Sequence, residues 1–250
     1  MRKLSRILPK RSGRSFGKLT VRHQGGRQKR YLRNIDFRRD KKDVWGKVEA
    51  IEYDPNRSAE IALILYEDGE RKYIIAPNGL AIDQKVIASE AAPIEVGNSL
   101  PLSKIPVGTL IHNLEIRPGK GGQMVKSAGS AAVLQGREEG FTLVKLPSGE
   151  IRRFLPECIA TIGQLGRVEA KSERWGLAGR KRRMGIRPTV RGVAMHPDAH
   201  PHGGGEGRSS VGLKYPKTVY GRKAVGKTRM KNKYSNRLII EGRRKGKHTA

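Results

Sequence analysis

The stretch Ile61-Ala-Leu-Ile-Leu-Tyr-Glu-Asp-Gly-Glu-Arg-Lys-Tyr-Ile-Ile-Ala76 decides the fold class of this chain. Two apolar, β-prone runs, Ile61–Tyr66 and Arg71–Ala76, flank a short turn that contains Asp-Gly. Asp-Gly between such runs is a strong local signal for a tight antiparallel hairpin. Both faces of the first run are apolar, as expected where a sheet curls closed on itself. The sequence therefore predicts an all-β domain built around this hairpin.

The segments on either side add further strands to a first barrel. Val44–Tyr53 has the pattern of a strand that ends at the turn Asp54-Pro-Asn56, and Val86–Ala88 and Thr109–Ile116 have the pattern of later strands. Five or so short strands without a clear helix predict an OB-fold barrel over residues 43–117. We interpret its carboxylates as a solvated face; they are Glu49, Glu52, Asp54 and Glu60.

A second small barrel, of the SH3-like type, is predicted over residues 118–177. After the glycine-rich loop Pro118–Gly122, short apolar segments alternate with tight turns, and Pro147–Glu150 joins two of them as a hairpin. The expected strands are Ala131–Gln135, Phe141–Leu146, Ile151–Leu155, Ile159–Ile162 and Gly166–Ala170. The single cysteine, Cys158, excludes an internal disulfide framework, and its apolar neighbours predict a buried thiol.

Charge is concentrated at the two ends of the chain. Residues 1–42 carry 16 Lys and Arg against two acidic residues, and residues 178–250 carry 20 against three, whereas residues 43–117 have a net charge of −5. These ends form a basic N-terminal extension and a basic, glycine-rich C-terminal extension. Cationic arms of this size favour binding to nucleic acid, because Lys and Arg release the counterions that screen phosphates. We expect no membrane partner, because the apolar runs are too short to span a bilayer.

Both arms lack hydrophobic periodicity and have little apolar surface to offset chain entropy. We therefore expect the C-terminal arm to be extended and to become ordered only with its partner. The arms also supply the candidate nucleic-acid-binding residues, since guanidinium groups bind phosphate in a bidentate manner and stack on bases. These residues are Arg22, His23, Arg27, Lys29, Arg30, Arg33, Arg38, Arg39, Arg180, Arg182, Arg187, Arg191, His200, His202, Gly203, Gly204, Gly205, Arg208, Lys227 and Arg229.

The segment Met195–Arg208 contains three histidines, and it raises the questions of a metal site and of catalysis. No Cys-x-x-Cys or second ligand pair accompanies the histidines, so we expect no protein-held metal. A catalytic histidine needs an orienting partner and a water-poor pocket, which a glycine-rich arm does not provide. The favoured interpretation is a turn-rich loop whose imidazoles and amides bind nucleic acid, with Gly203–Gly205 allowing close backbone approach.

At these residues the sequence resembles the universal family of large-subunit ribosomal protein number two, in its bacterial form. The resemblance runs through nearly the whole chain. It includes Thr20-Val-Arg-His-Gln-Gly-Gly26, Ile51-Glu-Tyr-Asp-Pro-Asn-Arg-Ser-Ala59, Gly108-Thr-Leu-Ile-His-Asn-Leu-Glu115, Arg187-Pro-Thr-Val-Arg-Gly192 and His200-Pro-His-Gly-Gly-Gly-Glu-Gly-Arg208. It implies the same two barrels and a structural constituent of the large subunit. It also implies primary rRNA binding, subunit assembly and association, tRNA placement and support of the peptidyl transferase region.

Three departures from the family pattern bear on these expectations. The N-terminal stretch is shorter than usual, Ala199 replaces the carboxylate that usually precedes His200, and Arg182-Arg183 stand where an Arg-Trp pair is usual. The family has been credited with peptidyl transferase activity through the histidine matching His200. Without its acidic neighbour we expect no catalysis by His200, and we expect the RNA to perform the chemistry.

The expected partners are large-subunit rRNA, small-subunit rRNA at the subunit interface, and neighbouring ribosomal proteins. The expected location is the cytoplasmic ribosome, with an organelle ribosome left open. No cofactor is expected. Whether an rRNA-associated magnesium ion lies near the C-terminal glycine-rich loop is left open by the sequence. Two alternatives remain: an RNA-directed enzyme that uses His200, and a DNA-coating architectural protein.

Overall fold

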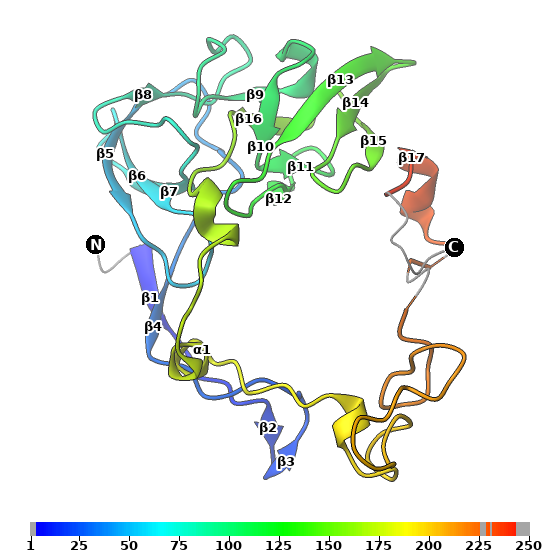
Figure 1. Ribbon diagram of the computed structural model, residues 1–250. Helices are drawn as coiled ribbons and strands as arrows, with labels where there is room; N and C mark the ends of the chain where they lie inside the picture. Colours follow the sequence, from blue (N-terminus) through cyan, green and yellow to red (C-terminus); the bar gives the residue numbers. More distant parts are fainter. Residues whose placement is uncertain (1–3, 226–228, 231, 244–250) are drawn as a thin grey trace. The chain divides into compact units, whose positions relative to one another are not determined.

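The computed structural model describes residues 4–225, 229–230 and 232–243, and the chain divides into two compact units (Figure 1). Among the described residues, the barrel unit comprises 4–8, Lys29–Arg174 and Arg237–Arg243, and the arm unit comprises Pro9–Gln28, 175–225, 229–230 and 232–236. All four clusters of buried apolar side chains found among the described residues lie in the barrel unit. The hydrophobic effect therefore stabilises the barrel unit far more than the arm unit.

The predicted hairpin forms the centre of a four-stranded antiparallel sheet. In the order of the sheet, its strands are β7 (Arg71–Ile75), β6 (Ile61–Tyr66), β5 (Gly46–Glu52) and β8 (Lys85–Val86). The turn is closed by a hydrogen bond of 2.9 Å from the Tyr66 amide to the Glu70 carbonyl, and Gly69 takes a φ of +79°. Five of the six residues of β6 are buried, which confirms that both of its faces are covered.

A seven-stranded antiparallel sheet forms the second part of the barrel unit. In the order of the sheet, its strands are β17 (Ile239–Glu241), β15 (Ile151–Phe154), β14 (Phe141–Lys145), β13 (Ala132–Glu138), β10 (Leu110–His112), β16 (Ile159–Ile162) and β9 (Ser99–Pro101). The hairpin predicted across Pro147–Glu150 is confirmed, because β14 pairs with β15. Cys158 lies fully buried in the main apolar cluster of this sheet, and burial raises the pKa of its thiol to about 11.

The strand expected at Thr109–Ile116 within the first barrel is a wrong prediction in two respects. Asn113 adopts a φ of +49° and interrupts the strand. The segment before it, β10, pairs with β13 and β16 in the seven-stranded sheet, and the segment after it, β11 (Leu114–Glu115), pairs with β12 (Gly122–Met124). Burial decides this placement, since Ile111 and Leu114 are fully buried in the cluster of the second sheet.

Two further sequence expectations are corrected. The strand expected at Gly166–Ala170 does not form, and the 3-10 helix η3 (Val168–Lys171) takes its place, because Arg167 adopts a left-handed φ of +56° and ends the extended course of the chain. Asp54 does not belong to a solvated face, since its side chain is fully buried. Its carboxylate accepts hydrogen bonds from the Asn56 amide at 3.0 Å and from Arg57 Nε at 2.7 Å, so it holds the turn after β5.

The remaining elements are short. They are β1 (Ser5–Leu8) paired with β4 (Arg30–Arg33), β2 (Arg14–Ser15) paired with β3 (Lys18–Leu19), α1 (Ala178–Met184), and the 3-10 helices η2 (Leu102–Lys104), η4 (Gly192–Ala194) and η5 (Tyr234–Leu238). The protein is thus all-β, with an OB-type barrel followed by an SH3-like barrel and long basic extensions. Among the described residues, no helix has the length and apolar character needed to cross a bilayer.

His112 gives the barrel unit a predictable dependence on pH. Its side chain is 1% exposed and its Nδ1 lies 2.8 Å from the Gly163 carbonyl oxygen, and burial lowers its pKa from 6.5 to about 4. Between pH 4 and pH 6.5, His112 is therefore protonated in the unfolded chain but neutral in the folded chain. We expect the free energy of unfolding to fall by about 3 kcal/mol as the pH drops from 6.5 to 4, with no contribution from this group above pH 6.5.

Urea unfolding of the full chain at several pH values, followed by tryptophan fluorescence, measures this change in the free energy of unfolding. His112→Asn is the matched variant, because its side-chain amide can still donate to the Gly163 carbonyl but does not titrate. The difference between the two proteins should grow below pH 6.5. Parallel pH curves for the two proteins would contradict the assignment.

Candidate nucleic-acid interface

The two basic extensions, which the sequence treats as separate arms, pair with each other inside the arm unit. Gln24 and Ile186 form an antiparallel β-bridge, and the Gly25 amide donates to the Gly185 carbonyl at 2.7 Å. Hydrogen bonds also join Arg187 N to the His23 carbonyl (2.9 Å) and Gln28 N to the Arg183 carbonyl (3.0 Å). We call this set, His23–Gln28 with Arg183–Arg187, the arm junction.

Glycine at position 25 permits this close approach. A Cβ atom there would lie 3.1 Å from Cγ of Arg187 and 3.2 Å from Nη1 of Arg182. Two guanidinium-bearing side chains therefore lie against the backbone of the N-terminal segment, and the exposed Arg22 and His23 come directly before it. The junction thus collects cations from both ends of the chain.

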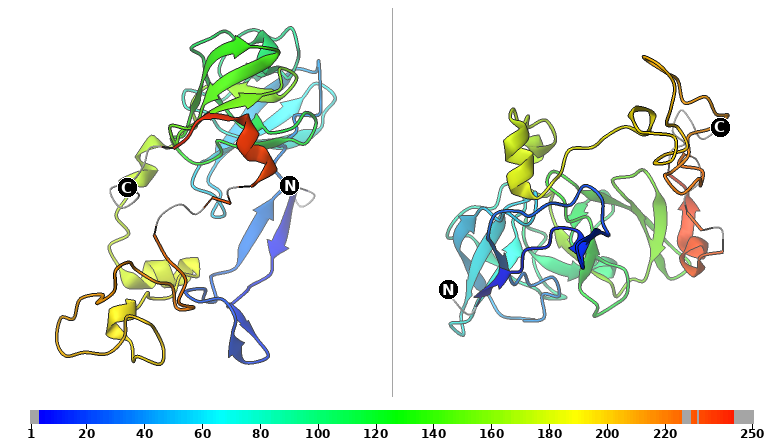
Figure 2. Two further views of the ribbon diagram at one scale, coloured as in Figure 1. Left: turned by 90° about the vertical axis from the view of Figure 1, so that its right-hand side faces the viewer. Right: turned by 90° about the horizontal axis from the view of Figure 1, so that it is seen from below.

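Helix α1 contributes a second run of cations and is a departure from the extended C-terminal arm that we expected. Ala, Arg, Lys and Met favour the helical state. The helix ends in a Schellman motif, in which the Gly185 amide donates to the Arg182 carbonyl and the Ile186 amide to the Lys181 carbonyl, both at 3.0 Å, with Gly185 at φ +94°. Figure 2 shows α1 in yellow-green from two directions. Its basic side chains are all exposed; they are Arg180, Lys181, Arg182 and Arg183.

Almost no acidic side chain opposes these cations. Segments 9–28 and 175–236 together contain 21 Lys and Arg but two acidic residues, Asp198 and Glu206. Asp198 pairs with His196 at 3.2 Å, on side chains that are 92% and 73% exposed. Arg180 instead lies over the ring of Trp175, 5.0 Å from its centre. A surface of one sign on this scale attracts a polyanion and weakens with salt.

The histidine-rich loop is a compact, internally bonded turn. The ring of His200 covers Gly192, where a Cβ atom would lie 2.5 Å from Nδ1 of His200. Its Nδ1 accepts the His202 amide at 3.0 Å, and Nε2 of His202 accepts the Lys217 amide at 2.9 Å. These acceptor roles leave the proton on Nε2 of His200 and on Nδ1 of His202, so each ring keeps one N–H group that can donate to another molecule.

The pKa of His200 is lowered from its ordinary value, mainly by desolvation and further by His202 and Arg22. A neutral imidazole is therefore favoured. No carboxylate contact is found at His200 among the described residues, in agreement with Ala199 as its predecessor. Groups of three or more His, Cys, Asp or Glu side chains that could hold a metal ion are also absent from the part of the chain that the structure describes. The loop therefore has the chemistry of a hydrogen-bond donor surface.

The structure explains why position 203 is glycine, which the sequence did not reveal. A Cβ atom there would lie 2.6 Å from the Met195 carbonyl oxygen, so the loop itself needs glycine at this position. Gly204 and Gly205 differ, since they adopt φ values of +90° and +89°. Their backbone conformation, rather than a close approach of RNA alone, explains the Gly-Gly-Gly run.

The predicted residues of the barrel unit have mixed environments. In β4, Arg33 forms two ion pairs: its Nε lies 3.5 Å from Oε2 of Glu52, and its Nη1 lies 3.7 Å from Oδ1 of Asp54. These ion pairs hold β4 to the first sheet. Arg30 is half-buried in the same strand, and Lys29 lies over the ring of Tyr31 at 5.7 Å. Rather than lying free on an arm, this group is anchored to the first barrel.

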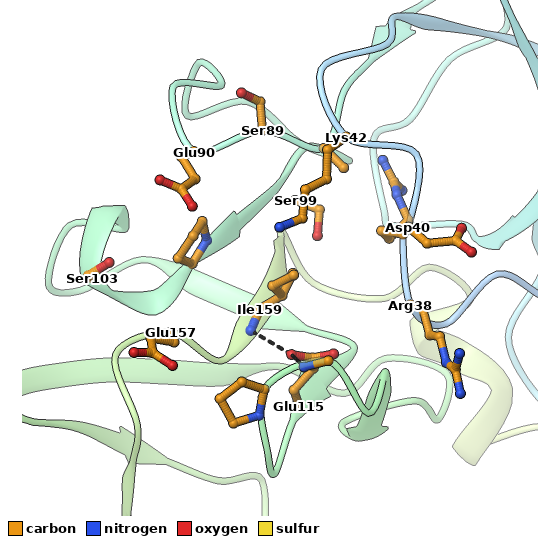
Figure 3. Close-up of a pocket in the computed structure, with 15 residues that line it drawn as sticks. Arg38, Asp40, Lys42, Ser89, Glu90, Ser99, Ser103, Glu115, Glu157 and Ile159 are labelled. Carbon is orange, nitrogen blue, oxygen red and sulfur yellow. Dashed lines mark hydrogen bonds between the residues drawn. The ribbon is translucent and has the colours of Figure 1, made fainter.

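Arg38 and Arg39 line a cavity of about 640 Å³ within the barrel unit. Figure 3 shows Arg38 and Asp40 on one side of it and Glu90 and Glu157 on the other. The lining holds three basic and four acidic side chains, so it is not a phosphate pocket. Arg39 is only 2% exposed and, in this conformation, has almost no surface to offer an RNA, so its contact with rRNA stays a prediction.

Other predicted residues lie apart from the junction. Arg191, Arg208 and Arg229 are exposed in the arm unit, and Lys227 lies outside the described residues. Sequence reasoning omitted Lys181 and Arg183, although they belong to the same exposed helix as Arg180 and Arg182. The helix-forming composition followed by Gly185 was the signal that could have found them.

Backbone amides of the Pro118–Gly122 loop donate hydrogen bonds to a carboxylate of the protein itself. The buried Glu115 accepts the Gly121 amide at 2.7 Å and the Gly119 amide at 3.3 Å. It also accepts the Ile159 amide at 3.1 Å, as Figure 3 shows. These amides are therefore occupied within the protein and do not bind phosphate.

Two β-barrels that carry a cationic, nearly acid-free unit define a structural RNA-binding protein. Comparison with family models agrees with this class. Residues 1–88 match the model described as Ribosomal Proteins L2, RNA binding N-terminal domain, and residues 95–221 match Ribosomal Proteins L2, C-terminal domain. The chain therefore belongs to the ribosomal protein L2 family, whose role is structural and RNA-binding in the large subunit of the ribosome.

Proposed function

We propose that this protein acts as a brace for large-subunit rRNA, with the barrel unit bound at the RNA surface and the arm unit inserted between RNA helices. The arm junction is the observation that supports this most directly. It brings guanidinium groups from both ends of the chain together, within segments 9–28 and 175–236, which contain only two acidic residues, Asp198 and Glu206. Phosphates that must approach each other closely in folded RNA supply the missing negative charge.

Support of subunit assembly, of subunit association, of tRNA placement and of the peptidyl transferase region belongs to the same proposal. So do contacts with small-subunit rRNA and neighbouring ribosomal proteins, and a cytoplasmic location. A magnesium ion near Gly203–Glu206 would be held chiefly by rRNA oxygens. We infer that the protein itself performs no catalysis, because among the described residues no carboxylate orients His200 as a general base would require.

Chemical footprinting of large-subunit rRNA tests the proposal. Truncation of residues 178–250 is a poor design, because it also removes β17 from the seven-stranded sheet. A better variant keeps the full chain and changes Arg22, Arg182 and Arg187 to Gln. We expect the wild-type protein to protect rRNA near the catalytic centre and the variant to lose that protection while it keeps the protection given by the barrels.

Equal protection by the two proteins would contradict the role of the arm unit. The enzyme alternative predicts turnover by isolated protein that His200→Ala abolishes. The DNA-coating alternative predicts binding to duplex DNA as tight as binding to structured rRNA at the same salt concentration.

A further inference from the structure

Two hairpin tips in the arm unit each present an exposed aromatic ring, then a glycine, then a cation. The first tip is Phe16-Gly17-Lys18 and the second is Tyr220-Gly221-Arg222. The side chain of Phe16 is completely exposed, at 101% of its reference area, and that of Tyr220 is 85% exposed. Neither ring takes part in the arm junction or in the histidine-rich loop.

The first tip is a two-residue hairpin loop between β2 and β3 (dark blue in Figures 1 and 2). Phe16 and Gly17 have φ values of +46° and +76°, the signs that a type I′ turn requires at both central positions. Asn or Gly is favoured there, and a bulky side chain in this region is an outlier that costs free energy. The hairpin is anchored at its base, where Thr20 and Val21 amides donate to the Gly13 carbonyl at 2.9 and 3.0 Å.

The second tip is a three-residue loop. Thr218 N donates to the Arg222 carbonyl at 2.7 Å, Gly221 N donates to the Thr218 carbonyl at 2.9 Å, and Lys217 and Lys223 form an antiparallel bridge. Gly221 takes a φ of +76°, as expected for a turn followed by a left-handed residue. Tyr220 therefore stands at the apex of a hairpin that hydrogen bonds hold in place.

Both rings lie in regions without acidic residues. The sequence has no Asp or Glu from residue 1 to 35, and none from 207 to 240. Near Phe16 the cations include the exposed Arg14 and Lys18, and the exposed Arg222 follows Tyr220 by two residues. An apolar ring surrounded by cations matches a nucleotide, which offers a flat π-face next to a phosphate. A protein partner would have to provide a strongly acidic surface around each ring.

We propose that Phe16 and Tyr220 are base-stacking residues, each receiving one unpaired base of the RNA that the arm unit enters. This inference rests on the proposed RNA-binding function and assigns two further residues to it. A strained, fully exposed phenylalanine gains a contact in the complex that the free protein does not offer. The glycine after each ring keeps the turn narrow, so that the ring projects beyond the backbone of its hairpin.

The test uses the full chain and an in vitro transcript of bacterial large-subunit rRNA, with Kd measured over a range of salt concentrations. Phe16→Asn removes the ring but places a favoured residue in the type I′ turn, so the hairpin is kept. Tyr220→Leu removes the second ring and keeps an apolar side chain. Each change should weaken binding by roughly 5- to 150-fold, the range expected when one stacked base loses its ring.

The salt dependence should stay at its wild-type slope, because every phosphate-binding cation is kept. Phe16→Tyr and Tyr220→Phe keep an aromatic ring and should restore binding. Leu19→Ala, an exposed apolar residue next to the first tip, serves as the matched control and should bind as the wild type does. Chemical probing should show one newly reactive unpaired nucleotide for each ring removed.

Wild-type affinity in both ring-free variants would overturn the inference, as would failure of the ring-retaining variants to restore it. A defect that appears only when other ribosomal proteins are present would assign the rings to a protein contact, and would also overturn it. If the wild-type protein itself does not bind the transcript, the proposed function fails and the stacking inference fails with it. These results are distinguishable in one series of measurements.

Discussion

Replacing Glu115 by alanine should lower the free energy of unfolding by about 3–5 kcal/mol. The carboxylate is 1% exposed and accepts three backbone amides, from Gly119, Gly121 and Ile159. Without it, three N–H groups lose their partner between the Pro118–Gly122 loop and β16. Unpaired buried donors are among the costliest changes that a single substitution can make. Chemical denaturation of the full chain measures the loss.

Glu115→Gln provides a graded comparison. One oxygen can still accept the two amides of Gly119 and Ile159, but an NH2 group then faces the Gly121 amide. We expect a stability between those of the wild type and the alanine variant. Glu157→Ala, on the rim of the same cavity and exposed, should change stability by no more than about 0.5 kcal/mol. An alanine variant at position 115 with wild-type stability would show that the three hydrogen bonds contribute little.

Changing Arg22, Arg182 and Arg187 together to glutamine should reduce the affinity for large-subunit rRNA by roughly 100-fold at moderate salt, if each guanidinium contributes about 1 kcal/mol. The more specific expectation concerns salt. Removing one cation that binds a phosphate lowers the slope of log K against log salt by about one, so the slope should flatten by roughly 2–3. Filter binding between 50 and 200 mM salt gives both quantities.

A control variant with the same change of net charge separates local binding from overall charge. Lys47, Lys85 and Arg71 lie in strands of the first sheet, and Lys47 and Arg71 each pair with a carboxylate, at 2.7 Å from Asp83 and from Glu49. Their replacement by glutamine should leave the slope nearly unchanged. Equal flattening in both triple variants would mean that net charge, and not the cations in and next to the arm junction, sets the affinity.

The sequence predicted those parts of the fold that short-range signals control. The Ile61–Ala76 hairpin follows from Asp-Gly between β-prone runs, and β14 and β15 follow from their tight turn. The strand at Thr109–Ile116 was misplaced because its partners, β13 and β16, lie far along the chain. A single residue in the left-handed region, Asn113 or Arg167, was enough to alter the expected element. Such conformations have weak sequence signals when the residue is not glycine.

The arm unit was less predictable for a different physical reason. Its cations could be counted from the sequence, and they are present as counted. The pairing of Gly25 with Gly185 depends on backbone hydrogen bonds between distant segments that show no hydrophobic period. The ring of His200 over Gly192 is likewise a local packing detail without a pattern. Hydrogen bonds that do not accompany a hydrophobic core leave almost no trace in composition or periodicity.

The place of β17 has a consequence for synthesis of the chain. β15 pairs on one side with β14 and on the other side with Ile239–Glu241. The ribosome that makes the chain must add residues 155–238 before it reaches this second partner. At common translation speeds this interval is roughly 5–15 s. A nascent molecule therefore carries an unprotected strand edge for several seconds, the kind of edge on which neighbouring chains aggregate. We expect late closure of the sheet to leave the newly made protein open to aggregation until residues 239–241 have been added.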